Sequence, residues 1–251
     1  MKLLLLGTAG YHPNERRHTP CLLLPGCGVM LDAGTGFFRA IDRLETGRLD
    51  VFLSHVHLDH VIGLSYLFDL LWRRPGVSVR VHALPAKLEA IERHLFSEQL
   101  FPKRPPYEAV PLADETPLAG GGDSPPGRLT HFPLEHAGGS LGFRLDWPDR
   151  SMAYVTDTTA AEQAPYIERI RGVDLLVHEC SFGDDQADWA QQTGHSHTTP
   201  VARVARAARV GRLILVHLNP LSEADDPVGL ATARGIFPET TLGVDGMVIE
   251  F

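Results

Sequence analysis

The sequence predicts an α/β protein whose core is made of two β-sheets with helices on the outside. Short apolar runs bounded by Gly, Pro and Asp recur along the chain, which is typical of strands. Amphipathic segments lie between them on both sides of Gly120, which favours this layered arrangement over a simple doubly wound sheet. The 251 residues suffice for one buried core and are too few for two comfortable domains, so we expect a single domain over residues 1–251.

The expected strands are identified by their apolar content, their short length and the breakers at their ends. Most of them contain Leu, Val or Ile in consecutive positions, so we expect them to be buried. In chain order they are Lys2–Leu6, Cys21–Leu24, Val29–Leu31, Val51–Leu53, Val79–Val81, Leu129–Leu134, Leu141–Leu145, Met152–Val155, Leu175–Val177, Leu213–Val216 and Met247–Phe251.

The expected helices lie between these strands. In the third helix, Leu88, Ile91 and Leu95 repeat at helical spacing while charged residues lie on the other side, which is typical of a surface helix. The apolar face of the second helix suits either the core or a homodimer interface. The segments are Gly36–Thr46, Val61–Leu71, Ala86–Gln99, Ala160–Arg171, Asp185–Gln192, Pro200–Arg209 and Pro227–Ile236.

Two stretches interrupt the pattern. Leu118–Gly127 contains three consecutive glycines and two prolines, so we expect a loop that joins two strands or two halves of the domain. Phe101–Tyr107 cannot be helical because each of its prolines restricts the residue before it. This second stretch is either a lid over a site or a surface connection.

Composition excludes several classes of protein. Thirty-one Asp and Glu against 23 Lys and Arg give a formal net charge of −8, which excludes a broadly basic surface but not a local basic patch. The longest apolar stretch, Val61–Trp72, contains Asp69 and is too short for a membrane span, and Met1–Gly7 lacks the apolar region of a signal peptide. We therefore expect a soluble, cytoplasmic protein with no membrane partner. Three cysteines without a CxxC pair predict buried free thiols.

The strongest functional pattern directly follows the strand that ends at Leu53. His55, His57, Asp59 and His60 lie within six residues at a strand-to-helix turn. Imidazole and carboxylate ligands together suit Zn²⁺ or a similar first-row ion, and catalytic sites of this kind keep a position open for water. The pattern therefore predicts a metal centre.

The run from His55 to His60 resembles the signature of the metallo-β-lactamase superfamily. The resemblance implies an αββα sandwich and a hydrolase of esters, amides or phosphodiesters with one or two metal ions. It also implies three further ligands at strand ends, which are found in His136, Asp157 and His217.

The resemblance assigns every ligand to one of two divalent ions. Zn²⁺ is expected, with Mn²⁺ or Fe²⁺ as alternatives. Asp59 is also assigned to catalysis. By this match His55, His57 and His136 hold the first ion, Asp59, His60 and His217 hold the second, and Asp157 bridges them with a water molecule between the ions.

Four further residues are candidates for supporting the ligands or contacting the substrate: Asp32, Thr8, His197 and Asn219. A buried Asp32 would accept the free N–H of a ligand histidine and fix its tautomer, or it would cap the helix that begins at Gly36. His197 adds an imidazole that would contact the substrate or replace His195.

Four segments extend the resemblance to ribonuclease Z and related phosphodiesterases: Leu3–Gly10, Leu176–Phe182, Gly194–Ser196 and Leu242–Glu250. The match implies that His195 contacts the phosphate and protonates the leaving group, and that Glu179 orients it. Spacing alone favours a solvent-exposed loop position for His195 and a cap or surface position for Glu179.

Only one hairpin fits between His136 and Asp157, where tRNA-processing members of that family carry a long arm. The net negative charge agrees with this difference, because Lys and Arg supply most RNA affinity. We therefore expect hydrolysis of a small or cyclic phosphodiester through a metal-activated hydroxide, and expect extended RNA binding to be unlikely. Arg16 and Arg17 would reach a phosphate or belong to an ordinary loop.

Three alternative functions remain open. The same centre would support a lactone, carboxyl-ester or thioester hydrolase, because a fold does not decide its chemistry. The other two alternatives are a ribonuclease Z-like RNA endonuclease and a non-catalytic binding protein that is stabilised by its metals.

Overall fold

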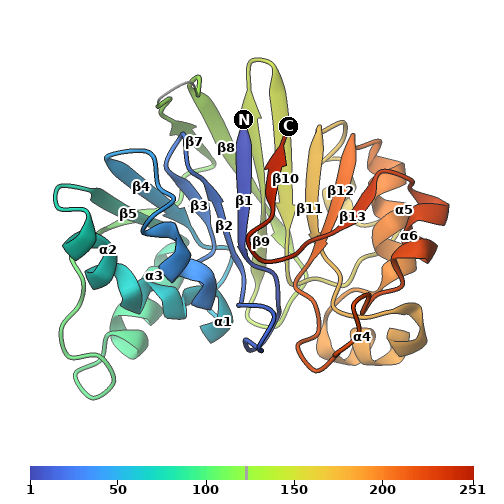
Figure 1. Cartoon of the computed structure of the whole chain (residues 1–251), viewed down its shortest axis with the longest axis horizontal. Helices are drawn as coiled ribbons and strands as arrows, with labels where there is room; N and C mark the ends of the chain where they lie inside the picture. Colours follow the sequence, from blue (N-terminus) through green and yellow to red (C-terminus); the bar gives the residue numbers. More distant parts are fainter. Residues whose placement is uncertain (122–123) are drawn as a thin grey trace.

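The computed structural model describes residues 1–121 and 124–251. Two seven-stranded sheets pack face to face, and helices cover the outer face of each sheet (Figure 1). This arrangement confirms the predicted αββα sandwich. One sheet contains β1 to β6. Strand β14 returns from the end of the chain and pairs with β1, so both termini lie in this sheet.

The first sheet is mixed. Its strand β1 is antiparallel to β14 and β2, whereas β3, β4, β5 and β6 are parallel to one another. In spatial order the strands are β14 (Val248–Glu250), β1 (Lys2–Gly7), β2 (Cys21–Leu24), β3 (Val29–Leu31), β4 (Arg48–Phe52), β5 (Ser78–Ala83) and β6 (Glu108–Pro111).

The second sheet is also mixed. Strands β10 to β13 are parallel, and β9 is antiparallel to both of its neighbours, so β8 runs in the same direction as β10. In spatial order the strands are β13 (Thr240–Leu242), β12 (Arg212–Val216), β11 (Leu175–Glu179), β10 (Arg150–Val155), β9 (Ser140–Trp147), β8 (Gly127–Leu134) and β7 (Glu115–Leu118).

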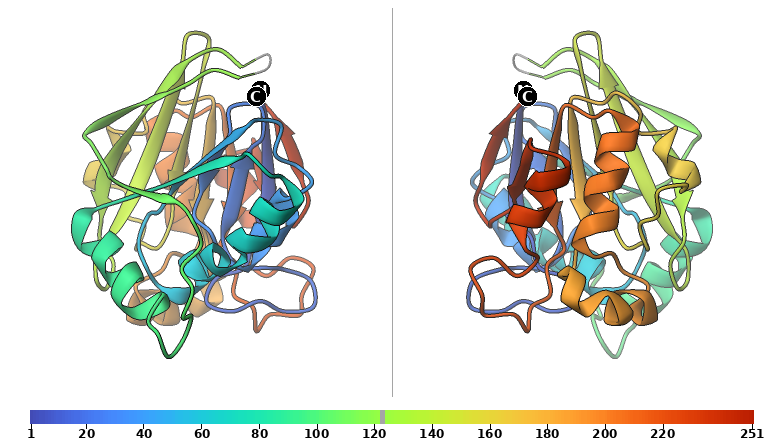
Figure 2. Two further views of the ribbon diagram at one scale, coloured as in Figure 1. Left: turned by 90° about the vertical axis from the view of Figure 1, so that its left-hand side faces the viewer. Right: turned by 90° about the vertical axis from the view of Figure 1, so that its right-hand side faces the viewer.

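The helices are short. Helices α2 and α3 cover the first sheet, and α5 and α6 cover the second (Figures 1 and 2). In the described part of the chain no helix is long and apolar enough to cross a membrane. The α-helices are α1 (Leu58–Val61), α2 (Leu67–Arg73), α3 (Pro85–Ala90), α4 (Ala187–Thr193), α5 (Thr198–Ala208) and α6 (Leu230–Ile236). Other helical turns are η1 (Thr35–Ala40), η2 (Ile62–Tyr66), η3 (Ile91–Leu95), η4 (Pro165–Ile167) and η5 (Asp184–Gln186).

Apolar side chains form three buried layers, one between the sheets and one between each sheet and its helices. Phe52, Phe143 and Tyr154 lie in the central layer and are fully buried. The three cysteines are buried free thiols, as predicted. Burial of this much apolar surface supplies the main driving force for folding. The strands at the sheet edges therefore need not bury further apolar side chains.

Three strands were missed by the sequence prediction: β6, β7 and β13. They lie at sheet edges, and their sequences contain Glu, Thr and Pro rather than a continuous apolar run. An edge strand is covered on fewer sides, so its side chains need not be apolar. Periodicity therefore has little to detect there.

The predicted helices are shorter or interrupted. The segment Ala160–Arg171 contains only the turn η4, which begins at Pro165. The predicted Val61–Leu71 helix is divided among α1, η2 and α2. Its apolar residues, including Leu64 and Leu67, are buried against the first sheet, so this face serves the core within one chain.

The two interrupting stretches are connections. Leu118 ends β7 and Gly127 begins β8, with a bridge between Gly121 and Ser124; the part of the predicted loop at 122–123 lies outside the described residues. Phe101 stacks on the ring of Phe68 in α2 with centroids 6.3 Å apart. The hydroxyl of Tyr107 donates to Glu92 at 2.6 Å. These contacts hold Phe101–Tyr107 against the first half of the molecule as a packed surface connection.

The buried carboxylate of Asp50 in β4 allows a test of how side-chain contacts stabilise the first sheet. Its carboxylate accepts hydrogen bonds from Arg80 at 2.5 Å and from His82 at 3.2 Å. Burial raises the pKa of Asp50, but the hydrogen bonds from His82 and Arg80 outweigh burial and lower the pKa to about 2. A carboxyl pKa that is lower in the folded state than in the unfolded chain stabilises the fold above the unfolded value.

We expect Asp50→Asn to lower the free energy of unfolding by about 2 kcal/mol at pH 7. The difference from wild type should narrow as the pH falls from about 4 toward 2, where the carboxylate becomes protonated in both states. Urea unfolding at several pH values measures this. Asp42→Asn is the matched control, because Asp42 pairs with Arg73 on the surface and should change stability by less than about 1 kcal/mol. A difference that does not depend on pH would contradict the prediction.

Candidate metal centre

The candidate ligands follow the C-terminal ends of strands that come together at one edge of the sandwich. His55 and His57 lie in the extended segment after β4, and Asp59 and His60 lie in α1. His136 follows β8, Asp157 follows β10 and His217 follows β12. Because β8, β10 and β12 run in the same direction, their ends deliver these three side chains to the same place.

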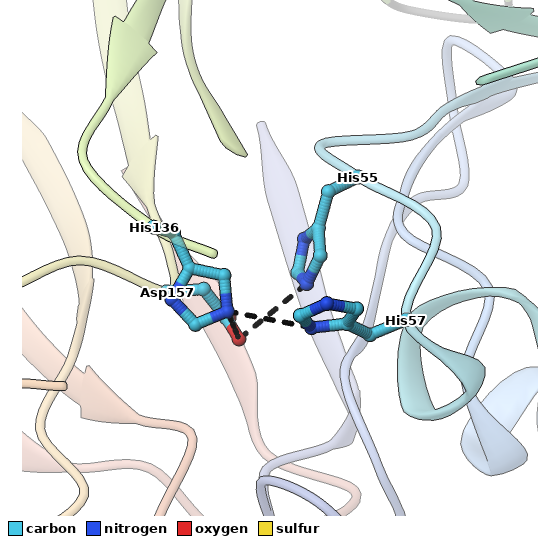
Figure 3. Close-up of side chains that lie close together, drawn as sticks. All are labelled: His55, His57, His136 and Asp157. Carbon is cyan, nitrogen blue, oxygen red and sulfur yellow. Dashed lines mark hydrogen bonds and ion pairs between the residues drawn. The ribbon is translucent and has the colours of Figure 1, made fainter. Parts of the chain in front are cut away.

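One group of donors surrounds one carboxylate oxygen (Figure 3). His55, His57, His136 and Asp157 each offer an atom within 4.8 Å of the others. His55 Nε2 and His136 Nε2 both lie 3.5 Å from Oδ2 of Asp157. Nδ1 of His57 lies 3.3 Å from Nε2 of His136. The ring nitrogens thus converge on one point beside Asp157.

A second group surrounds the other oxygen of the same carboxylate. Oδ1 of Asp157 lies 3.2 Å from His60 Nε2 and 3.3 Å from His217 Nε2. Asp59, His60 and His217 offer atoms within 4.8 Å of one another. Each oxygen of Asp157 therefore faces one group, which is the geometry needed for a carboxylate that bridges two ions.

Three residues around this centre have an unusual backbone. Asp32, Asp157 and His217 have φ values of 55°, 46° and 57°, in the left-handed region that residues other than Gly rarely adopt. Such strain persists only where the surrounding structure enforces it, and it is common at functional sites. Asp32 and His217 directly follow β3 and β12, and Asp157 follows β10 after Thr156, so the turn after each strand also orients a carboxylate or an imidazole.

The electrostatics of the site suit a cation. Burial lowers the pKa of His55 well below its usual value, so its imidazole is neutral with a lone pair available. Burial opposes ionisation of Asp157, but the neighbouring His217 and His60 outweigh it and hold the pKa of this carboxyl well below its usual range. Nε2 of His55 is buried and has no hydrogen-bond partner within the described part of the chain. A divalent ion accepts such a lone pair, so the donors fit a metal.

Asp32 supports the second group. Its Oδ2 accepts a hydrogen bond from His60 Nδ1 at 2.8 Å, which leaves Nε2 of His60 facing Asp157. The same carboxylate accepts hydrogen bonds from the backbone N–H of Ser54 at 2.8 Å and the hydroxyl of Tyr154 at 3.0 Å. The alternative cap role is not observed, because Gly34 occupies the cap position of η1 without a side-chain hydrogen bond. Asp32 thus fixes the tautomer of a candidate ligand.

Glu179 and His195 form a pair beside the centre. His195 Nδ1 lies 3.1 Å from Oε1 of Glu179, which is fully buried and also accepts a hydrogen bond from the backbone N–H of Thr158 at 2.8 Å. Burial lowers the pKa of His195, but Glu179 outweighs burial and raises it to about 9. The ring of His195 stacks on that of His217 with centroids 5.0 Å apart. Neither a surface position for Glu179 nor a solvated loop position for His195 is observed.

The family assignment rests on comparisons with known proteins. The model of the "Beta-lactamase superfamily domain" matches residues 28–218. A ribonuclease Z of Synechococcus sp. (strain CC9605) is 31% identical over the whole chain, which covers 98% of that protein.

The chain belongs to the metallo-β-lactamase superfamily. Membership makes it a metal-dependent hydrolase, as the sequence predicted. The ribonuclease Z of Archaeoglobus fulgidus is 27% identical over 99% of this chain and 97% of its own length. Divalent metal ions are therefore expected at the His and Asp clusters.

Solved structures of the superfamily share the fold. The metallo-β-lactamase fold protein YhfI from Bacillus subtilis superposes with a TM-score of 0.81 at 21% identity, over 99% of both chains. The short form of human tRNase Z superposes with a TM-score of 0.75 at 23% identity, over 100% of this chain and 99% of its own.

The expectation that extended RNA binding is unlikely is wrong. Three curated relatives that align over the full chain are ribonuclease Z proteins, which conflicts with it. Net charge is a sum over the whole surface and does not describe the groove beside a centre. The short β9–β10 hairpin lies between His136 and Asp157, and both of these residues still belong to a donor group.

The other supporting candidates have different surroundings. The hydroxyl of Thr8 donates a hydrogen bond to Asp245 at 2.7 Å. The carbonyl of Thr8 accepts a hydrogen bond from the N–H of Leu218, so Thr8 stabilises the turn that follows His217. His197 lies 2.6 Å from Asp184 and is not brought to the donor groups. Asn219 lines a cavity next to His217.

The two arginines considered for phosphate binding have partners elsewhere. Arg16 pairs with Asp225 at 2.6 Å. Arg17 is buried and donates to Thr8 at 2.8 Å and to the carbonyl of Gly243 at 2.6 Å. Both side chains are thus engaged by partners outside the two donor groups.

Sequence reasoning missed residues that hold the ligands in place. The hydroxyl of Ser181 lies 3.2 Å from Nδ1 of His217 and donates to the His217 carbonyl at 2.8 Å. A Cβ at Gly10 would come within 2.3 Å of the His217 ring, so only Gly fits there. Both residues lie within segments that resemble the family, which was the available signal; their contacts depend on the three-dimensional arrangement.

Removing one donor from each group tests the ligand assignment. We expect wild type to bind two Zn²⁺ ions per chain, and His57→Ala and His217→Ala each to retain one, because each substitution removes a nitrogen from a different group. Asp157→Ala should weaken both sites. Elemental analysis after dialysis against buffered Zn²⁺ measures the stoichiometry, and a thermal shift on chelation measures its link to stability.

His94→Ala is the control, because His94 is exposed and lies outside both groups. It should leave the metal content unchanged. Equal loss of metal in His94→Ala and His217→Ala, or full metal content in Asp157→Ala, would contradict the assignment.

Proposed function

We propose that the protein is a dinuclear metal-dependent phosphodiesterase that hydrolyses a small or cyclic phosphodiester. The observation that carries the proposal is His195, held by the buried Glu179 beside the carboxylate that two donor groups share. Hydrolysis of a phosphodiester needs a nucleophile, neutralisation of the phosphoryl oxygens and a proton for the leaving oxygen. The residues at this edge offer groups for each task.

Two divalent ions held by the donor groups would supply Lewis acidity for the phosphoryl oxygens and would activate water. His55, His57 and His136 would hold one ion, Asp59, His60 and His217 the other, with Asp157 between them. In this proposal Asp59 contributes to catalysis only as a ligand. Zn²⁺ is the expected ion, and Mn²⁺ or Fe²⁺ would suit the same nitrogen and oxygen donors.

His195 would act as the acid. Its Nδ1 is occupied by Glu179, so Nε2 is the nitrogen that remains for a substrate oxygen. Glu179 acts through His195 and is a positioning residue. Its second oxygen accepts a hydrogen bond from the N–H of Ser196 at 3.1 Å, which restrains rotation of the carboxylate.

Cleavage of RNA is a second candidate function. It is favoured by the curated relatives, which are ribonuclease Z proteins at about 30% identity over the full chain. The same donor groups and the same acid would serve, because RNA cleavage is also hydrolysis of a phosphodiester. The two candidates therefore differ in the size of the substrate and not in the chemistry of the site.

A substrate panel tests the reaction class. We expect metal-loaded protein to hydrolyse bis(4-nitrophenyl) phosphate and 2′,3′-cyclic nucleotides, and Asp157→Ala to abolish this turnover because it removes an oxygen from each donor group. Precursor tRNA, lactones and thioesters are assayed in parallel. Turnover of precursor tRNA with none of the small diesters would assign the second candidate. Turnover of acyl substrates alone would overturn the phosphodiesterase proposal.

The role of His195 has its own signature. We expect His195→Ala to lower kcat by about 10²–10⁴-fold for a diester with an alkoxide leaving group, and far less for 4-nitrophenolate, which leaves without a proton. His94→Ala should change neither rate. An equal loss with both leaving groups would show that His195 binds substrate and does not donate a proton.

A further inference from the structure

A cavity of about 480 Å³ opens beside the candidate metal centre. Its wall comes from the turn after β1, from the segment after β11, from α4 and from the residues after His217. The loops that follow β1 and β12 lie side by side at this edge (Figure 2) and are joined by a hydrogen bond from Asn14 to the carbonyl of Pro220. The cavity thus has a wall that is held together by contacts between distant parts of the chain.

The wall is apolar and rich in aromatic rings. Tyr11, Trp189 and Leu221 are 81%, 59% and 77% exposed, although side chains of this size are normally buried. Phe182 adds a fourth large side chain. Several exposed apolar residues gathered around one cavity indicate a site for an apolar ligand group.

The cavity contains few charges. His195 and His217 are the only histidines among the described residues that line it, and both lie at the end that meets the metal centre. No Lys, Arg, Asp or Glu is among these lining residues. A second phosphate would need a positive partner in this part of the wall, so the group that enters is uncharged.

The cavity and the centre share two histidines. His195 and His217 line the cavity, and His217 belongs to the second donor group. The backbone N–H of Tyr11, another lining residue, donates to Oδ2 of Asp59 at 2.8 Å. A phosphodiester with its phosphorus at the centre would therefore extend one of its two ester substituents into this cavity.

We propose that the cavity binds the nucleobase of a nucleoside ester and that Trp189 stacks on this base; this inference rests on the proposed phosphodiesterase function. A nucleobase is flat, uncharged and aromatic, which matches the wall. It also has donors and acceptors along its edge, which the amides of Gln186 and Asn219 in the same wall can meet. An alkyl chain has no hydrogen-bond donor or acceptor and would leave these amides without partners.

Calorimetric titration of zinc-loaded protein with two monophosphates tests the inference. Adenosine 5′-monophosphate and ribose 5-phosphate both carry the phosphate and differ in the base. We expect wild type to bind the adenosine compound more tightly. Trp189→Ala should weaken that binding by about tenfold, because stacking of a base on an aromatic ring contributes at this level, and should leave the Kd of ribose 5-phosphate unchanged. Trp189→Phe should restore most of the preference.

Trp72→Ala is the matched control. Trp72 is 85% exposed and lies on α2, the helix that covers the first sheet, and it is not among the residues that line the cavity. It should change neither Kd. Equal binding of the two monophosphates by wild type, an unchanged Kd for the adenosine compound in Trp189→Ala, or equal weakening of both would overturn the inference. Base-selective binding without turnover of any phosphodiester would leave the cavity assignment standing and would instead overturn the proposed function.

Discussion

The carboxylate of Asp157 is the constraint on which the rest of the site depends. One buried side chain presents Oδ2 to His55 and His136 and Oδ1 to His60 and His217. To present both oxygens it must lie between two donor groups, each of which combines side chains that follow strands of both sheets. A buried carboxylate among several imidazoles is costly unless positive charge accompanies it. The centre is therefore arranged for cations, and its stability is coupled to them.

The sandwich meets this constraint by separating folding from function. The apolar layer between the sheets contains Phe52, Phe143 and Tyr154 and would hold the strands in register without any ligand. Function is confined to the edge where strands end, and there the backbone has positive φ at Asp32, Asp157 and His217. The buried layers supply the stability that such strain consumes. Tyr154 connects the two regions, because its ring lies in the core and its hydroxyl donates to Asp32.

Sequence was informative where chemistry is local and less so where it depends on packing. The run His55–His60 is detectable because four donors occur within six residues, and the resemblance then locates His136, Asp157 and His217 at strand ends. Ser181 and Gly10 reach His217 from the segments after β11 and β1, and these contacts depend on the three-dimensional arrangement. The short helical turns η1 and η4 have amphipathic sequences that also suit longer helices, so periodicity overestimates them. The edge strands were missed for the opposite reason, since they need no apolar run.

The error on RNA binding shows why global quantities are weak evidence about a site. The formal charge of −8 is distributed over the whole surface, whereas a substrate interacts with the few residues within a Debye length of about 10 Å. Part of the cavity wall is neutral: Trp189 and Phe182 are apolar, and Gln186 and Asn219 carry amides. With metal ions bound, a neutral aromatic wall beside the centre would distinguish the parts of a nucleotide, because the phosphate would be held by charge and the base by stacking. That division does not depend on whether the nucleotide is free or part of a polymer. In this proposal the local wall determines which chemical group is recognised, and the net charge of the whole chain does not.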